Sequence, residues 1–116
     1  MKLVALAATV TLLGVLAIPA ALAGTPTLNG TDGPGFTITL TKAGKKVSKL
    51  KRGTYIFKIA DKSSVHNFHL KGPGIDKKTS VGKSEKVTWK LKLKPGKYTF
   101  VCDPHKSFMK GSFTVS

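Results

Sequence analysis

The sequence contains one cysteine, Cys102, so no internal disulfide can hold the fold together and side-chain packing must do so. Its 116 residues leave room for one domain and a short additional segment. A hydrophobic fraction of 41% is too high for a disordered chain and predicts a packed core. A lone thiol in such a chain indicates metal binding or chemical reactivity.

Acidic residues are also scarce, since 5 Asp and Glu stand against 20 Lys and Arg for a net charge of +15. A field of this sign attracts anionic partners. Along residues 85–94, however, lysines alternate with apolar residues and therefore form the solvent face of a predicted strand, where lysine also protects exposed edges. The aromatic residues follow the inward periodicity and leave no platform for stacking bases. We therefore expect no nucleic-acid partner.

Residues 1–23 have the features of a signal peptide. Lys2 precedes an apolar run over residues 3–18, Pro19 interrupts it, and residues 21–23 present the small-x-small pattern of a cleavage site. An uncleaved membrane anchor is the alternative, because the run approaches the roughly 20 residues that span a bilayer. We predict export to the periplasm or the extracellular space, with membrane attachment only if this segment is not cleaved.

Helical periodicity is absent after residue 23, and short runs of period two take its place. They predict strands over residues 36–41, 54–60, 65–71, 85–94, 97–102 and 111–115. Residues 24–35 are rich in Gly, Pro, Thr and Asp and predict an extended N-terminal arm or linker. The prediction is an all-β sandwich or barrel formed by residues 36–116.

Three side chains that bind soft metals lie within eight residues of one another, between two predicted strands: Cys102, His105 and Met109. A thiolate, an imidazole and a thioether favour copper over harder cations. Zinc also accepts Cys and His, but Met is an unusual ligand for it. A Cys–His hydrolase would need an oriented base and an oxyanion site, and no motif for either is visible.

A further imidazole must come from His66 or His69 if the set is to resemble the trigonal plane of two His and one Cys that copper proteins use. Strand alternation separates the two histidines. If Phe68 and Leu70 point to the core, His66 points inward with them and His69 faces solvent or a loop. His66 is therefore the predicted ligand.

The pattern Cys102-x-x-His105-x-x-x-Met109, preceded by residues 96–101, resembles the copper loop of plastocyanin-like cupredoxins. The upstream pair His66-Asn67 is similar to the first ligand of that family and its neighbour. The resemblance implies a Greek-key β-sandwich of about eight strands that binds one type 1 copper per chain through His66, Cys102, His105 and Met109. It also implies that Asn67 braces the loop near Cys102.

The same resemblance implies a one-electron carrier rather than an enzyme, with His105 as the electron port. We expect a monomer that docks transiently with a redox partner protein, and the cationic surface predicts that this partner is acidic. The alternative is a copper-binding protein for storage, delivery or resistance that has no redox partner. Since the sequence has no Met-rich or His-rich tract, it favours the carrier.

Overall fold

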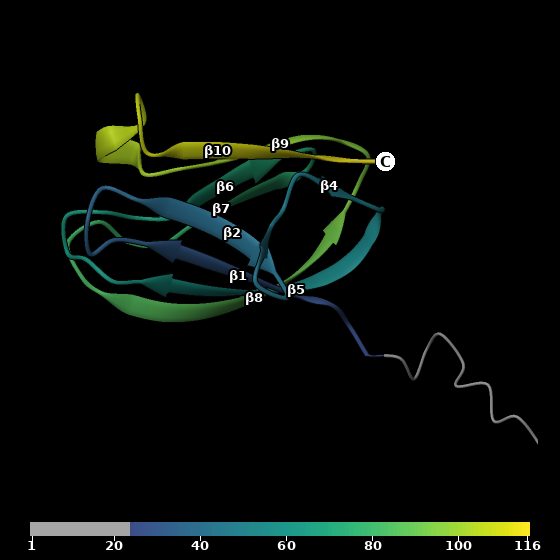
Figure 1. The fold of residues 1–116 in the computed structure, drawn as a ribbon, viewed down its shortest axis with the longest axis horizontal. Helices are drawn as coiled ribbons and strands as arrows, with labels where there is room; N and C mark the ends of the chain where they lie inside the picture. Colours follow the sequence, from purple (N-terminus) through teal and green to yellow (C-terminus); the bar gives the residue numbers. More distant parts are fainter. Residues whose placement is uncertain (1–23) are drawn as a thin grey trace, which may run out of the picture.

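Residues 24–116, the part of the chain that the computed structural model describes, form two five-stranded β-sheets packed face to face (Figure 1). The strand order is β3-β2-β1-β5-β8 in one sheet and β4-β10-β9-β6-β7 in the other. The predicted signal segment lies outside the described residues. The strands are β1 (Thr27–Asp32), β2 (Ile38–Lys42), β3 (Lys45–Lys46), β4 (Lys49–Leu50), β5 (Gly53–Asp61), β6 (His69–Gly72), β7 (Ile75–Lys78), β8 (Glu85–Leu93), β9 (Gly96–Val101) and β10 (Lys110–Val115).

Buried and exposed side chains alternate along β5 and β8, and both predicted strands are confirmed. Tyr55, Phe57 and Ile59 are buried along β5, whereas every second residue of β8 is an exposed lysine or threonine. The two strands pair antiparallel from Gly53 opposite Leu93 to Asp61 opposite Glu85. Because β8 lies at the edge of its sheet, its inward side chains before the buried Leu93 are only partly covered.

The prediction that residues 24–35 form an arm or linker is wrong. They contain β1, which lies inside the first sheet between antiparallel β2 and parallel β5. Leu28, Gly30 and Asp32 point inward and are buried. The segment has few residues that favour strands, but the backbone hydrogen bonds offered by two neighbouring strands outweigh that weak preference. The domain therefore begins before residue 36.

The predicted strand over residues 65–71 is correct only at its C-terminal end, where β6 begins at His69. The residues before it form a loop in which His66, Asn67 and Phe68 are all buried, at 1%, 1% and 0% exposure. A strand with one buried face buries only every second side chain, so these three residues do not follow strand alternation. His66 points inward as predicted, although the loop and not strand parity directs it there.

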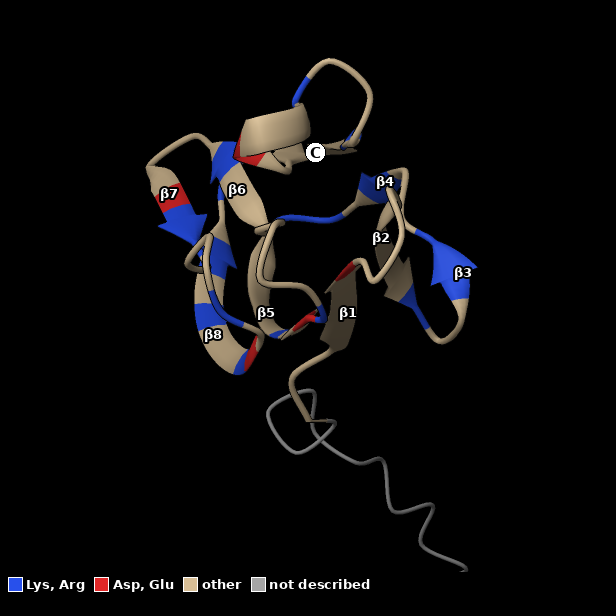
Figure 2. Ribbon diagram, turned by 90° about the vertical axis from the view of Figure 1, so that its left-hand side faces the viewer, with Lys and Arg blue, Asp and Glu red and all other residues tan. Residues whose placement is uncertain are grey.

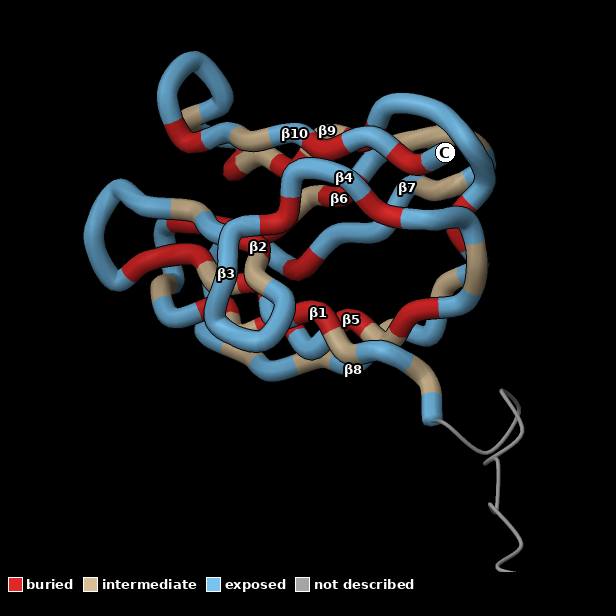
Figure 3. Tube along the Cα trace, turned by 45° about the vertical axis from the view of Figure 1, so that its right-hand side comes forward, coloured by how far each residue is buried: buried red, intermediate tan, exposed pale blue. Residues whose placement is uncertain are grey.

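Aromatic pairs fill the space between the sheets, where the buried segments of Figure 3 face one another. Phe68 stacks on Phe100 with ring centroids 5.5 Å apart, and Tyr98 stacks on Phe113 at 5.1 Å. The Tyr98 hydroxyl also donates a hydrogen bond of 2.8 Å to the carbonyl of Lys94. These contacts fix β9, which Cys102 directly follows. No helix within residues 24–116 is long and apolar enough to cross a membrane.

The loops after β1, β5 and β9 meet at one end of the sandwich, on the left in Figure 1. The loop between β9 and β10 contains a short 3₁₀ helix, η2 (Asp103–His105). Pro104 lies in its first turn, where the fixed φ of proline suits a helix start. This end of the molecule carries all the predicted metal ligands.

Candidate metal centre

Backbone hydrogen bonds close the β9–β10 loop and give it one compact shape. The His105 amide donates to the carbonyl of Cys102 at 3.0 Å, and the Met109 amide donates to the carbonyl of His105 at 2.8 Å. The Cys102 amide donates to the carbonyl of Met109 at 3.0 Å, which joins the two ends of the loop. These hydrogen bonds hold Cys102, His105 and Met109 together in one closed loop.

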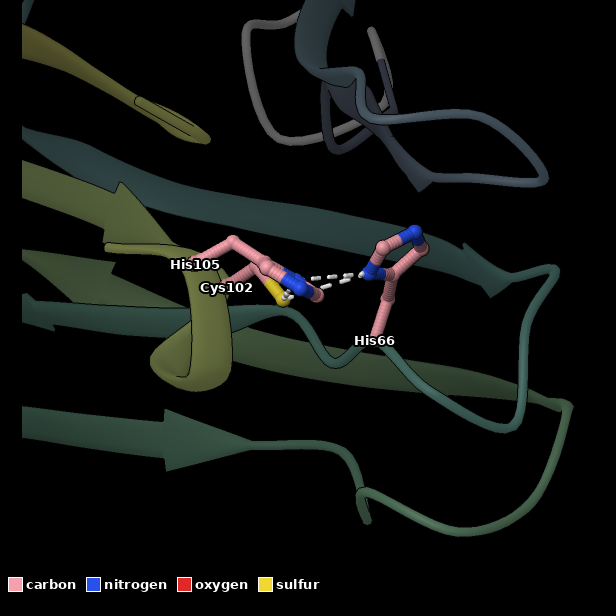
Figure 4. Close-up of side chains that lie close together, drawn as sticks. All are labelled: His66, Cys102 and His105. Atoms are coloured by element: carbon pink, nitrogen blue, oxygen red, sulfur yellow. Dashed lines mark hydrogen bonds between the residues drawn. The ribbon is translucent and has the colours of Figure 1, made fainter. Parts of the chain in front are cut away.

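The structure brings His66, Cys102 and His105 together, with their donor atoms within 4.8 Å of one another (Figure 4). The Cys102 Sγ atom lies 3.6 Å from the Nδ1 atom of His66 and 3.6 Å from that of His105. The two Nδ1 atoms are 3.1 Å apart. His66 comes from the loop before β6, 36 residues upstream of Cys102, so the packing of the sheets creates this triangle.

The triangle has the size that a metal ion requires. An ion about 2.0 Å from nitrogen and about 2.3 Å from sulfur in a trigonal plane separates those two atoms by about 3.7 Å. The observed sulfur–nitrogen separations of 3.6 Å match this value, and the 3.1 Å between the two nitrogens is somewhat shorter than the about 3.5 Å of an ideal trigonal plane. Two imidazoles and one thiolate form the plane of a type 1 copper site, so the donor set and its spacing both fit copper.

Met109 lies at the other end of the same loop and is 1% exposed, so its thioether is shielded from water and would be available as a fourth ligand. His66 and Cys102 are 1% and 0% exposed. His105 is the more accessible ligand because it is only partly buried. The four residues are arranged as a type 1 copper site with one ligand near the surface.

Asn67 braces the loop at the residue that follows Cys102. Its Oδ1 atom accepts a hydrogen bond of 2.8 Å from the Asp103 amide, and its Nδ2 atom donates one of 2.8 Å to the Asp103 carboxylate. Nδ2 also lies 3.4 Å from the carbonyl of Thr79. Asn67 therefore joins the segment that carries His66 to the segment that carries Cys102.

The electrostatics of the site oppose a free thiolate. Burial raises the pKa of the Cys102 thiol, and hydrogen bonds from the backbone of Asn67 and His105 offset this only in part. Burial also tends to raise the pKa of Asp103, but hydrogen bonds from His69 and Asn67 hold it below its usual value. Without a metal the thiol is protonated near neutral pH, so metal binding must displace that proton.

Two exposed phenylalanines flank the accessible ligand. Phe36 is 64% exposed, and its ring centroid lies 5.4 Å from that of His66 and 5.1 Å from that of His105. Phe108 is 58% exposed, with its ring 5.5 Å from His105. Sequence reasoning assigned Phe36 to a strand and missed its place at the site. A large aromatic residue directly after the Gly33-Pro34-Gly35 turn was the available signal.

A family model described as a cupredoxin-like domain matches residues 6–115. The chain belongs to the cupredoxin-like family. The resemblance found in the two ligand segments is thus confirmed for the chain as a whole, and so is the all-β sandwich it implied. Comparison with curated protein sequences gave no match.

Solved structures with the same fold include a mutant of rusticyanin, at TM-score 0.58 and 20% identity over 79% of this chain and 78% of that chain. Rusticyanin from Thiobacillus ferrooxidans gives a TM-score of 0.55 and 19% identity, over 79% and 77% of the two chains. A multi-copper oxidase from Pediococcus acidilactici gives 0.55 and 15%, over 81% of this chain and 27% of that chain. At these identities the similarity establishes the fold and leaves the activity to the site itself.

Proposed function

We propose that this protein is a one-electron carrier whose redox centre is a single type 1 copper. The observation that carries the proposal is the convergence of two imidazoles and a thiol at a spacing set by the fold. When bound, copper would supply the one-electron couple between Cu(I) and Cu(II). His66, Cys102, His105 and Met109 would hold it, and the stacked core behind them would keep their geometry nearly constant in both oxidation states.

Burial of the ligands favours a carrier over an enzyme. His66, Cys102 and Met109 are each at most 1% exposed, which leaves no open ligand position for a substrate. His105 is the partly exposed ligand, and Phe36 and Phe108 form an apolar rim beside it. Such a rim excludes water from a small transient interface and brings the His105 ring close to a partner. We assign His105 as the electron port.

The carrier hypothesis predicts fast electron exchange without loss of copper. In a mixture of reduced and oxidised copper-loaded protein, line broadening of the NMR signals of ligand residues measures the self-exchange rate. We expect this exchange to be much faster than copper transfer to a metal-free acceptor. Slow exchange together with ready copper transfer would instead support a storage or delivery protein that uses the same ligands.

The charge distribution supports an acidic redox partner. Among the described residues, Asp32 and Asp61 are buried, Asp76 and Asp103 contact His69, and Glu85 pairs with Lys83. Lysines therefore make up most of the charged positions along β3, β4, β7 and β8 (Figure 2). Long-range attraction between this surface and an acidic protein would speed their encounter.

Steering of this kind predicts a strong salt dependence. We expect the association rate constant with an acidic redox partner to fall by about tenfold as salt is raised from low to physiological ionic strength and above, because screening shortens the range of the attraction. Stopped-flow kinetics at several salt concentrations measures this. A rate that is flat across ionic strength would contradict steering by the lysine surface.

We also propose that the protein acts outside the cytoplasm. The support is the sequence of residues 1–23 and the lone thiol, which a copper site would protect from oxidation. N-terminal sequencing of the exported protein tests this proposal, and a mature chain starting near Gly24 is the expected result.

A further inference from the structure

His69 occupies an unusual position between two carboxylates. Its Nδ1 atom lies 2.8 Å and 3.0 Å from the two oxygens of Asp103, and its Nε2 atom lies 2.5 Å from Oδ1 of Asp76. The His69 side chain is 12% exposed, although those of Asp103 and Asp76 are 41% and 64% exposed. Carboxylate oxygens accept hydrogen bonds, so the Nδ1–H group of His69 is the donor to Asp103.

The two contacts of His69 lead to different parts of the fold. Asp76 belongs to β7, the neighbour of β6 in the sheet, so this contact stays within one hairpin. Asp103 is the first residue of η2 and directly follows Cys102. The contact with Asp103 therefore crosses from the rigid sheet to the loop that carries most of the metal ligands.

The Asp103 carboxylate is shared between His69 and Asn67. Its Oδ2 atom accepts hydrogen bonds from Asn67 Nδ2 at 2.8 Å and from His69 Nδ1 at 3.0 Å. Asn67 follows His66, and the Asp103 amide donates back to the Asn67 side chain at 2.8 Å. A rotation of this carboxylate would break the contact with Asn67, and the hydrogen bonds between His69 and both carboxylate oxygens oppose that rotation.

We infer that His69 is a positioning residue of the metal centre, which fixes the first turn of the loop over residues 102–109 by orienting Asp103. The inference rests on the proposed copper site for its functional consequence, but the hydrogen bonds that carry it belong to the protein alone. Outer residues that orient a metal ligand commonly change metal affinity by 10-fold to 100-fold when they are lost. Here the orientation passes through Asp103 to Cys102 and His105.

Two conservative variants separate the two contacts. The side-chain nitrogen of Asn is as many bonds from Cα as His Nδ1, so His69→Asn can still donate to Asp103 and loses the contact with Asp76. The side-chain nitrogen of Gln is as many bonds from Cα as His Nε2, so His69→Gln can still donate to Asp76 and loses the contact with Asp103. If His69 acts through Asp103, Asn preserves its role and Gln does not.

Hydrogen exchange of the Asp103 amide in the metal-free protein is the first readout. We expect about tenfold faster exchange in His69→Gln than in wild type, and near wild-type exchange in His69→Asn. In the copper-loaded protein, we expect copper removal by a chelator to be about tenfold faster for the Gln variant and nearly unchanged for the Asn variant. Asp76→Asn is the matched control and should leave the Asp103 amide protected.

The inference is wrong if the Asp103 amide exchanges equally fast in the two His69 variants. It is also wrong if Asp76→Asn loses as much protection at that amide as His69→Gln. In either case His69 would act through the β6–β7 hairpin. If the Gln variant does not fold, rapid exchange of the Asp103 amide in His69→Asn overturns it alone. Wild-type protein that fails to bind copper would contradict the proposed function, whereas the exchange measurement would still decide the role of His69.

Discussion

Cys102→Ser is expected to abolish the intense visible absorption of the copper-loaded protein completely. That band arises from charge transfer between a thiolate and Cu(II), and Cys102 is the one cysteine of the chain. The Sγ atom lies 3.6 Å from both imidazole Nδ1 atoms and so forms the third corner of the ligand triangle. Titration of the purified domain with Cu(II), followed by absorption spectroscopy, measures the effect.

Serine is the stringent replacement at this position because it keeps the size and removes the soft ligand. Lys106→Ser is the matched control, since Lys106 is exposed in the same loop and its loss leaves the ligand set intact. We expect the control to keep the full band. A band that survives in Cys102→Ser, or a wild-type protein that stays colourless with copper and binds only zinc, would contradict the blue-copper assignment.

The sequence was sufficient for those parts of the site that are local. Cys102, His105 and Met109 fall on one loop, so their spacing alone indicates a shared ligand set. The strand β8 was equally clear because its alternation can be read from neighbouring residues alone: each Lys or Thr that faces water is followed by an apolar residue. The family resemblance rested on this loop with its flanking residues and on the upstream pair His66-Asn67.

Contacts between distant segments could not be predicted in the same way. The prediction that His66 points inward is correct, but it assumed that residues 65–71 alternate as a strand. His66 lies in the loop before β6, where no such alternation exists. Strand β1 was missed because its sequence, TLNGTD, has little strand preference of its own and gains its partners from β2 and β5. The parallel register between β1 and β5 also places Asp32 opposite Asp61, and no sequence pattern predicts this pairing.

That pair of aspartates provides the second large prediction, which concerns stability and pH. Asp32 is 0% exposed and Asp61 is 3% exposed. Asp61 accepts a hydrogen bond of 3.0 Å from the Thr79 hydroxyl, but neither oxygen of an ionised Asp32 finds a donor among the described residues. Burial raises the pKa of Asp32 to about 8, and hydrogen bonding to Asp61 and repulsion by its charge act in the same direction. A protonated Asp32 can donate to Asp61.

The sign of the effect follows from the two pKa values. In the unfolded chain Asp32 has its usual pKa of 3.8, so between about pH 4 and about pH 8 the folded state retains a proton that the unfolded state has lost. Each pH unit in that window lowers the free energy of unfolding by about 1.4 kcal/mol for an isolated group. The contribution of Asp32 is thus most favourable at acidic pH and declines as the pH rises to about 8.

Asp32→Asn should remove this decline, because the carboxamide has no proton to lose and can donate to Asp61 as the protonated acid does. We expect the variant to exceed wild type in free energy of unfolding by several kcal/mol at about pH 8, up to the roughly 5 kcal/mol that about four pH units at about 1.4 kcal/mol each allow, and to differ little at about pH 4. Urea denaturation of the metal-free protein across this range measures both values.

Asp76→Asn is the control of opposite sign. A hydrogen bond from His69 lowers the pKa of Asp76, so its ionised form stabilises the folded state above the usual pKa, and this contribution is lost as the pH falls. Its replacement should therefore make the protein slightly less stable at about pH 8, where Asp32→Asn makes it more stable. If both variants shift stability in the same direction at that pH, Asp32 is not held protonated in the folded protein, and the buried pair must be stabilised in another way.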